Sequence, residues 1–303
     1  MVHFRSIKEL VERCEREQKP ISEAMIEAEM AVSGRSREAI WNQMAQNLEV
    51  MEQAVKRGIT EDIRSRSGLS GGAAKKVQEY LARGMFLSGH TVLDAVSKAM
   101  AVNEVNAAMG TIVATPTAGA AGVVPGTLFA LSEKLEATRE QQIRFLFTAG
   151  AIGYIIANNA FIAGATGGCQ AEVGSATAMA AAAIVEMAGG TPRQSGEAVA
   201  IALKNLLGLV CDPVAGLVEA PCVKRNAMGA AVALVAADLA LAGVTSVIPP
   251  DEVIEAMYRI GASMPRALKE TALGGLAATP TGRALAAKIF GRPPAIEPQQ
   301  TGD

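Results

Sequence analysis

Aromatic residues and histidine are scarce in this 303-residue sequence. Phe, Trp and Tyr make up 4% of the chain and there are two histidines, whereas half of all residues are hydrophobic. The apolar mass is therefore Ala, Val, Leu, Ile and Met, which suits close helix–helix packing better than a sheet rich in aromatic and β-branched residues. At this length the chain can bury a large core, as one big domain or two closely packed ones.

The sequence also lacks an excess of one charge, and we expect that its start is not a signal peptide. Its formal net charge is −2, from 28 basic and 30 acidic side chains, which excludes a basic footprint for nucleic acid or anionic lipid. The start, MVHFRSIKELVERCERE, has no apolar run followed by a small-residue cleavage site. Four cysteines in so long a chain do not make a disulfide framework. We therefore expect a cytoplasmic, reducing setting, where clustered cysteines more often bind metal or act in catalysis.

A stretch without any charge, from Phe145 to Ala171, has the length of a membrane span. Against a span, Asn158 and Asn159 lie near its centre, and it is rich in Gly, Ala and Thr. Flanking aromatic belts and a one-sided Lys/Arg cluster are also missing. We interpret the stretch as a buried core helix and expect no association with a membrane.

Helix signals recur along the chain, and no run of alternating strands interrupts them. Ser6 and Glu9 have the spacing of a capping box. Thr191-Pro192 and Thr279-Pro280 place Thr at an N-cap and Pro at the first helical position. The fold class is therefore all-α, a large multi-helix domain with glycine-rich loops between the helices. Helices are expected after Pro20, from about Ser36 towards Arg57, and over 73–84, 91–108, 125–140, 143–163, 173–188, 193–208, 226–241, 251–261 and 280–290.

Charged residues are concentrated near the N-terminus. Residues 1–100 hold 29 of the 58 charged side chains, and residues 101–250 hold 17. We expect charged, exposed helices over 1–66 and a buried core over 67–290, which together make one catalytic domain over 1–290. The remaining segment, 291–303, has the composition of a disordered tail.

Three of the four cysteines lie where helices are expected to begin or end. Cys169 follows a glycine-rich turn in GATGGCQAEVG, Cys211 ends a helix in LLGLVCDPVAG, and Cys222 begins one in VEAPCVKRN. Free N–H groups at such places can hydrogen-bond sulfur and lower a thiol pKa. The absence of C-x-x-C argues against zinc, and widely spaced thiolates on loops favour an iron–sulfur cluster. Packed cysteines without metal are the alternative, to which Cys14, on an apolar helix face, is assigned.

Two loops are candidates for binding a small anionic ligand. The segment 67–72 (SGLSGG) leads directly into a helix, whose first N–H groups can bind a carboxylate. The segment 115–119 (TPTAG) offers two hydroxyls and a backbone that a ligand can approach closely. Ordinary helix-capping loops are the alternative for both. The candidate ligand-binding residues are Ser70, Gly71, Gly72, Thr115, Thr117, Gly119, Asn158 and Lys224.

Asn159 and His90 complete the set of candidate polar residues. Asn158, Asn159 and Lys224 are expected in apolar surroundings, where each needs a partner. The pKa range of His90 suits a general base. A helix-start residue without a catalytic part is the favoured interpretation of His90.

The segments SGLSGG, HTVLDAVSKAMAVNEVNAAMG, ATPTAGAAGVVPG, GATGGCQAEVGSA and CDPVAGLVEAPC are long and chemically unusual. Together they resemble the alpha subunit of the iron–sulfur-dependent L-serine dehydratases (L-serine ammonia-lyases), from about residue 1 to 290. The resemblance implies a [4Fe–4S] cluster bound by Cys169, Cys211 and Cys222, with both candidate loops near it. It also implies conversion of L-serine to pyruvate and ammonia without pyridoxal phosphate, the open iron acting as a Lewis acid.

Single-chain members of that family carry a small extra domain with a GPSSSHT-like stretch, which does not occur in this sequence. We therefore expect a separate beta subunit to supply that region, and with it a histidine for proton transfer. Two alternatives stay open. One is another iron–sulfur enzyme, a cysteine desulfidase or a different hydro-lyase, and the other is a non-enzymatic helical protein whose cysteines are only packed.

Overall fold

The computed structural model describes residues 4–291, and within this range the chain forms helices and no β-strand. The all-α class is therefore confirmed. An isolated parallel bridge joins Cys211 to Lys269. The tail predicted to be disordered lies outside the described residues except for Gly291.

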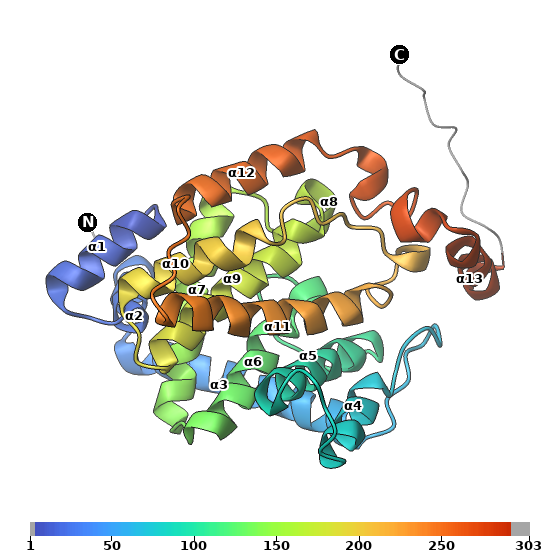
Figure 1. Ribbon diagram of the computed structural model, residues 1–303, viewed down its shortest axis with the longest axis horizontal. Helices are drawn as coiled ribbons and strands as arrows, with labels where there is room; N and C mark the ends of the chain where they lie inside the picture. Colours follow the sequence, from blue (N-terminus) through green and yellow to red (C-terminus); the bar gives the residue numbers. More distant parts are fainter. Residues whose placement is uncertain (1–3, 292–303) are drawn as a thin grey trace.

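The longer helices follow the expected order along the chain (Figure 1). They are α1 (Ile7–Glu17), α2 (Ile21–Ser33), α3 (Arg37–Thr60), α4 (Ala73–Ala82), α5 (His90–Ala107), α6 (Val123–Leu135), α7 (Arg139–Asn159), α9 (Ser175–Met187), α10 (Pro192–Lys204), α11 (Cys222–Leu241), α12 (Pro250–Ser263) and α13 (Pro280–Phe290). Short helical turns connect them. These are η1 (Ala118–Ala120), α8 (Gly164–Gly167), η2 (Gln170–Gly174), η3 (Val214–Gly216), η4 (Arg266–Leu268) and η5 (Gly275–Ala278).

The expected N-caps form, with one difference. Thr191 and Thr279 accept from backbone N–H groups at the starts of α10 and α13. Ser6 likewise accepts from the N–H of Glu9. The carboxylate of Glu9, however, accepts from the N–H of Arg5 rather than that of Ser6, so the reciprocal half of the capping box is missing.

One helix boundary was placed too late. The ranges 125–140 and 143–163 correspond to α6 and α7, which are separated at residues 136–138. Glu136 adopts a left-handed conformation that ends α6, and Thr138 forms a full capping box with Gln141 that starts α7.

The uncharged stretch from Phe145 to Ala171 is divided among α7, α8 and η2. Among residues 4–291, no helix combines the length and the apolar character that crossing a membrane requires.

The core is centred on the alanine-rich helix α9, whose residues 175–185 are all buried. Helices α6, α7, α10 and α11 pack around it. Small residues let the backbones approach closely: a Cβ on Gly229 of α11 would lie 2.8 Å from Oγ1 of Thr177 on α9. Figure 1 shows α11 running across the molecule, with α10 on one side and α5 on the other. Helices α1 and α2 lie against α10 and α7, so their apolar residues join the same core.

The cysteine-bearing segments belong to the layer around α9 and α11. The turns α8 and η2 precede α9 directly, and η2 contacts α11. η2 is a π-helical turn, a form that is frequent at functional sites. Gln170 holds it in place, because its side chain accepts from the N–H of Gly208 and donates to the carbonyl of Met257.

Candidate functional site

Cys169, Cys211 and Cys222 are buried, free thiols. Cys169 immediately precedes η2, and Cys222 is the first residue of α11. Cys211 lies in an extended segment, where its N–H donates to the carbonyl of Leu268 and its carbonyl accepts from the N–H of Glu270. Cys169 and Cys222 thus lie at the starts of helical segments, as predicted, whereas α10 ends at Lys204 and the helix end predicted at Cys211 is wrong.

The electrostatics of the three thiols show that they lie near one another. Burial, and then the negative charges of Cys169, Glu172, Glu270 and Cys222, raise the pKa of Cys211 far above its usual range. Burial followed by the charges of Cys169 and Glu172 raises the pKa of Cys222 to about 12. Three cysteines that are 42 and 11 residues apart in sequence thus share one site.

A positive charge lies beside these thiols. Burial raises the pKa of Cys169 to about 11, whereas the Arg225 guanidinium next to it opposes that rise. Nη1 of Arg225 is 2.8 Å from Oδ1 of Asp212 and donates to the carbonyl of Val210 at 2.7 Å. Arg225 is therefore fixed in position and can compensate negative charge on sulfur.

Glu172 is a buried carboxylate that the sequence reasoning missed. Oγ1 of Thr117 donates to its Oε1 at 2.6 Å. Burial raises the pKa of Glu172, with the hydrogen bond from Thr117 acting in the opposite direction and the charge of Glu270 adding to the rise. A signal was present in the sequence, since Glu172 ends the uncharged run and follows Cys169 by three residues.

Glycine backbone surrounds the Glu172 carboxylate. A Cβ on Gly119 would lie 3.0 Å from either carboxylate oxygen. A Cβ on Gly164 would lie 2.8 Å from both Oε2 of Glu172 and Sγ of Cys211. The predicted loop of 115–119 and the start of α8 therefore meet beside a cysteine, and a side chain at Gly164 would displace one of these groups.

The loop of 67–72 is tied to the segment that leads into Cys222. The hydroxyls of Ser67 and Ser70 donate to the two carboxylate oxygens of Glu219, at 2.7 and 2.6 Å. Gly71 has a φ of +133°, and a Cβ there would lie 2.2 Å from the carbonyl oxygen of Ile63, so glycine is required. The structure thus links this loop to a cysteine-bearing segment, while its role in substrate binding stays a prediction.

The N-terminus of α4 does not offer the free N–H groups that we expected after Gly72. The N–H groups of Ala73 and Ala74 donate to the carboxylate of Glu104, at 2.8 and 3.2 Å. Glu104 lies on α5 and is 1% exposed. The carboxylate of Glu104 therefore binds the N–H groups that we had predicted to bind the carboxylate of a ligand.

The loop of 115–119 is connected to α11 by Asn226, another residue that sequence reasoning missed. Nδ2 of Asn226 donates to the carbonyls of Gly119 and Cys222, and its Oδ1 accepts from the N–H of Gly122. Oγ1 of Thr115 is buried and has no hydrogen-bond partner within residues 4–291. An unsatisfied buried hydroxyl is costly, so Thr115 has a donor and acceptor available for a ligand.

Three candidates lie on the surface. Asn158, Asn159 and Lys224 are exposed, so the expectation of apolar surroundings was wrong for all three. Asn158 belongs to the last turn of α7, where its Nδ2 donates to the carbonyl of Tyr154, and Lys224 lies on the outer face of α11. Asn159, which is also exposed, donates to the carbonyls of Arg5 and Ile155. Their roles in ligand binding stay predictions.

His90 is exposed at the start of α5, with its ring edge-on to Phe86. This position agrees with the favoured interpretation of a helix-start residue. A catalytic role for His90 stays a prediction.

The described residues contain no ready-made site for a single metal ion. Among residues 4–291, no set of three or more His, Cys, Asp or Glu side chains is arranged to hold a metal ion.

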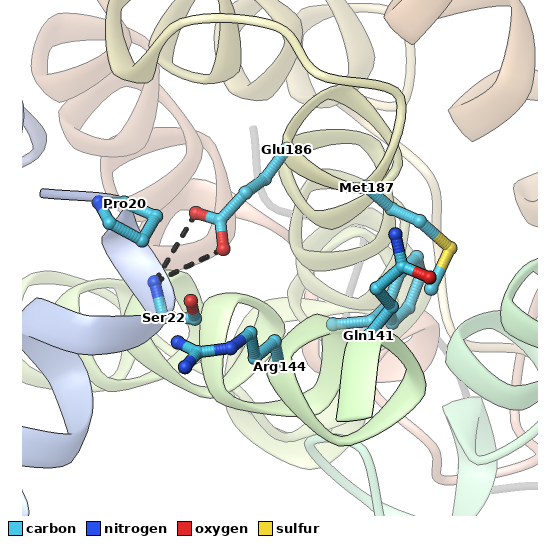
Figure 2. Close-up of a pocket in the computed structure, with 7 residues that line it drawn as sticks. Pro20, Ser22, Gln141, Arg144, Glu186 and Met187 are labelled. Atoms are coloured by element: carbon cyan, nitrogen blue, oxygen red, sulfur yellow. Dashed lines mark hydrogen bonds between the residues drawn. The ribbon is translucent and has the colours of Figure 1, made fainter. Parts of the chain in front are cut away.

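A separate pocket of about 200 Å³ lies between the start of α2, α7 and the end of α9. Figure 2 shows the carboxylate of Glu186 directed at the backbone N–H of Ser22, from which it accepts hydrogen bonds of 3.3 and 3.2 Å. The candidate site residues are absent from its lining. Glu186 serves here as a cap for the N-terminus of α2.

Comparison with known proteins agrees with the segments quoted from the sequence. The family described as "Serine dehydratase alpha chain" matches residues 16–277. The chain is 68% identical over 288 residues to a probable L-serine dehydratase alpha chain of Bacillus subtilis (strain 168), covering 95% of this chain and 96% of that protein. It is 44% identical over 276 residues to the L-serine dehydratase alpha chain of Peptoniphilus asaccharolyticus, covering 91% and 94%. It is 40% identical over 282 residues to the L-serine dehydratase of Streptomyces coelicolor (strain ATCC BAA-471 / A3(2) / M145), covering 90% of this chain but 60% of that protein.

Proposed function

The chain belongs to the serine dehydratase alpha chain family, and on this premise we propose that it is a lyase that eliminates water from L-serine to give pyruvate and ammonia. The relatives' names support the reaction and the substrate. The main observation behind the proposal is that Cys169, Cys211 and Cys222 lie close to the buried carboxylate of Glu172.

We further propose that the three cysteines hold a [4Fe–4S] cluster. Their number and the positive charge of Arg225 fit such a group, since thiolates bind separate irons of a cluster and carry negative charge. Gly164 keeps side-chain atoms away from the sulfur, because a Cβ there would lie 2.8 Å from Sγ of Cys211. When bound, the cluster supplies a Lewis acid at an iron without a protein ligand.

The chain's own residues have three tasks in this proposal. Burial of the cysteines excludes bulk water from the metal group and strengthens every electrostatic interaction there. Arg225, fixed by Asp212, offsets thiolate charge. Thr115 and Thr117 present hydroxyl groups next to the bare backbone of Gly119, where a small amino acid can be hydrogen-bonded.

We propose that the active enzyme contains a second polypeptide, a beta chain. Relatives that this chain covers almost completely are named alpha chain, whereas it covers 60% of an L-serine dehydratase without that qualifier. The beta chain would supply the remaining region and a histidine for proton transfer. Full turnover of L-serine by the cluster-loaded alpha chain alone would contradict this.

Location follows from the same chemistry. The four cysteines are free thiols, which supports a reducing, cytoplasmic location for the enzyme. A reducing compartment also preserves thiolate ligands for iron.

The test begins with protein purified without oxygen. We expect about four irons per chain, with acid-labile sulfide, and loss of both in Cys169→Ala, Cys211→Ala and Cys222→Ala. Cys14→Ala is the matched control, because Cys14 is also buried but lies on α1, where the charges acting on it come from Glu186, Arg13, Glu17 and Glu27 and not from another cysteine. Iron retained in all three variants would overturn the cluster assignment.

The substrate is tested by pyruvate formation from L-serine, L-threonine and L-cysteine, with the beta chain present. We expect the highest kcat/KM for L-serine. Sulfide release from L-cysteine at a higher kcat/KM would favour the desulfidase alternative, and iron-free protein without any turnover would favour a non-enzymatic helical protein.

A further inference from the structure

The carboxylate of Glu172 is buried without a cationic partner. It is 9% exposed, and the ion pairs among residues 4–291 do not include it. Arg225, the cation of this site, is paired with Asp212. A buried carboxylate that lacks a counter-ion is costly, so this position calls for a positive group from outside the described chain.

The surrounding charges add to this requirement. Glu270 and the thiols of Cys211 and Cys222 act on the same region, and each contributes negative charge or the capacity for it. If the thiols bind a metal group as thiolates, the carboxylate lies in a still more negative field. Such a field attracts a small cation and repels a second anion.

The two oxygens of Glu172 have different surroundings. Oε1 accepts from Oγ1 of Thr117 at 2.6 Å, which fixes the orientation of the carboxylate. Oε2 packs against Gly164, where an added Cβ would lie 2.8 Å from both Oε2 and Sγ of Cys211. The backbone of Gly164 also hydrogen-bonds the carboxylate, so both of these partners, Thr117 and Gly164, are neutral groups.

We propose that Glu172 binds the α-ammonium group of the amino acid substrate. An ammonium has three N–H donors and a compact positive charge, so it can pair with a carboxylate whose partners in the chain, Thr117 and the backbone of Gly164, are neutral. This inference rests on the proposed function and adds the ligand class, an α-amino acid rather than an α-hydroxy acid.

The test compares ligands that differ only in the amine. L-Alanine and L-lactate have no β-leaving group, so their binding to the cluster-loaded enzyme, with its beta chain, is measured by calorimetry without turnover. We expect the wild-type enzyme to prefer L-alanine. In Glu172→Gln, the Kd of L-alanine and the KM of L-serine should rise at least about tenfold, equivalent to about 1.4 kcal/mol, while the Kd of L-lactate should be unchanged or lower.

Glu270→Gln is the matched control. It removes a negative charge near Glu172 but leaves the hydrogen bond between Thr117 and Glu172 in place. It should raise the Kd of L-alanine much less than Glu172→Gln does. Equal weakening of L-alanine and L-lactate in Glu172→Gln would assign Glu172 a structural role. A fall in kcat with unchanged KM and Kd would assign it to proton transfer, and a changed electron paramagnetic resonance spectrum of the substrate-free reduced cluster would make it an iron ligand. Each of these three results overturns the proposal.

Failure of the proposed function would look different. If the wild-type enzyme released sulfide from L-cysteine and did not dehydrate L-serine, the serine dehydratase assignment would fall. The same comparison of L-alanine with L-lactate would still test Glu172, because a cysteine desulfidase, like a serine dehydratase, would bind the α-ammonium group of its substrate.

Discussion

The hydroxyl of Ser70 lies 2.6 Å from a carboxylate oxygen of Glu219, although 149 positions separate the two residues in sequence. Ser67 donates to the other oxygen of Glu219 at 2.7 Å. Glu219 is 6% exposed and is three residues before Cys222. The glycine-rich loop and the segment that presents a candidate cluster ligand are thus held together by one buried carboxylate.

Substitution of Glu219 should therefore weaken both the fold and the cluster. In Glu219→Gln the amide keeps one acceptor oxygen but turns the other acceptor into a donor, leaving a serine hydroxyl without its partner. We expect the free energy of unfolding to fall by about 1–3 kcal/mol, and iron to be lost faster on dilution into a chelator. Urea denaturation and iron retention measure the two effects. Ser88→Ala, at an exposed loop position, should change neither, and a Glu219→Gln protein that matched the wild type would show that the contact is unimportant.

Local chemistry was sufficient to predict the helix starts at Thr191 and Thr279, because a capping side chain and the N–H it accepts from are a few residues apart. The fold class also followed from composition, and the cysteine set from the quoted segments. Glu104, Glu172 and Glu219 were not found. Each acts on a group far away in sequence, so the sequence does not show its partner, although the position of Glu172 at the end of the uncharged run was a signal that it is buried.

Asn158 and Lys224 are exposed although we expected them to be buried, and this error also arose because the fold was not known. The uncharged stretch was interpreted as one buried helix, whereas α7 ends at Asn159 and its last turn reaches the surface. Lys224 lies beside Cys222 in sequence but on the opposite, outer side of α11. Hydrophobic content identified the buried helices, but it did not determine which face of a helix is covered in its first or last turn.

The cap on α4 predicts a stability effect for Glu104. In Glu104→Ala the N–H groups of Ala73 and Ala74 lose their acceptor, in a place where Ala74 is fully buried. We expect a decrease of about 1–3 kcal/mol in the free energy of unfolding, measured by urea denaturation. Glu12→Gln on the exposed face of α1 is the control and should change it by less than about 0.5 kcal/mol. If added L-serine restored the stability of Glu104→Ala alone, the vacated N–H groups would be able to bind a carboxylate.

The ion pairs of Glu23 predict a loss of stability in acid. Hydrogen bonds from Arg37 and then Arg144, at 2.8 and 3.3 Å, lower the pKa of Glu23 from 4.5 to about 2. A carboxyl whose pKa is lowered on folding stabilises the protein above its unfolded pKa and loses this contribution as pH falls from about 4.5 to 2. At pH 7 we expect Glu23→Gln to be less stable by about 2 kcal/mol, a value that allows for solvent screening at the half-exposed Arg37.

The difference between the wild type and Glu23→Gln should shrink as urea denaturation is repeated at lower pH. Glu255→Gln, which removes an exposed ion pair with Arg259, should follow the wild type at every pH. A constant difference across the pH range would mean that Glu23 stabilises the fold through packing rather than charge.

Cluster chemistry predicts sensitivity to oxygen. An iron without a protein ligand is open to oxidants, so activity should fall in air and return when ferrous iron and a thiol are added without oxygen. Serine turnover and the visible absorbance of the cluster are followed together. Turnover that survives both air and a strong chelator would show that iron takes no part in the reaction.

Two glycine-to-alanine substitutions distinguish an effect on activity from an effect on stability. Gly164→Ala adds a methyl group 2.8 Å from both Sγ of Cys211 and Oε2 of Glu172, so one of these groups must shift. Gly150→Ala adds the same methyl group within α7, where no atom lies within 4 Å, and should stabilise the helix by about 0.5–1 kcal/mol. We expect kcat/KM for L-serine to fall at least about tenfold in Gly164→Ala, because misplacement of about 1 Å at a reacting centre is costly. Gly150→Ala should retain wild-type activity. If both variants were fully active and both kept their iron, the space at Gly164 would not belong to the active site.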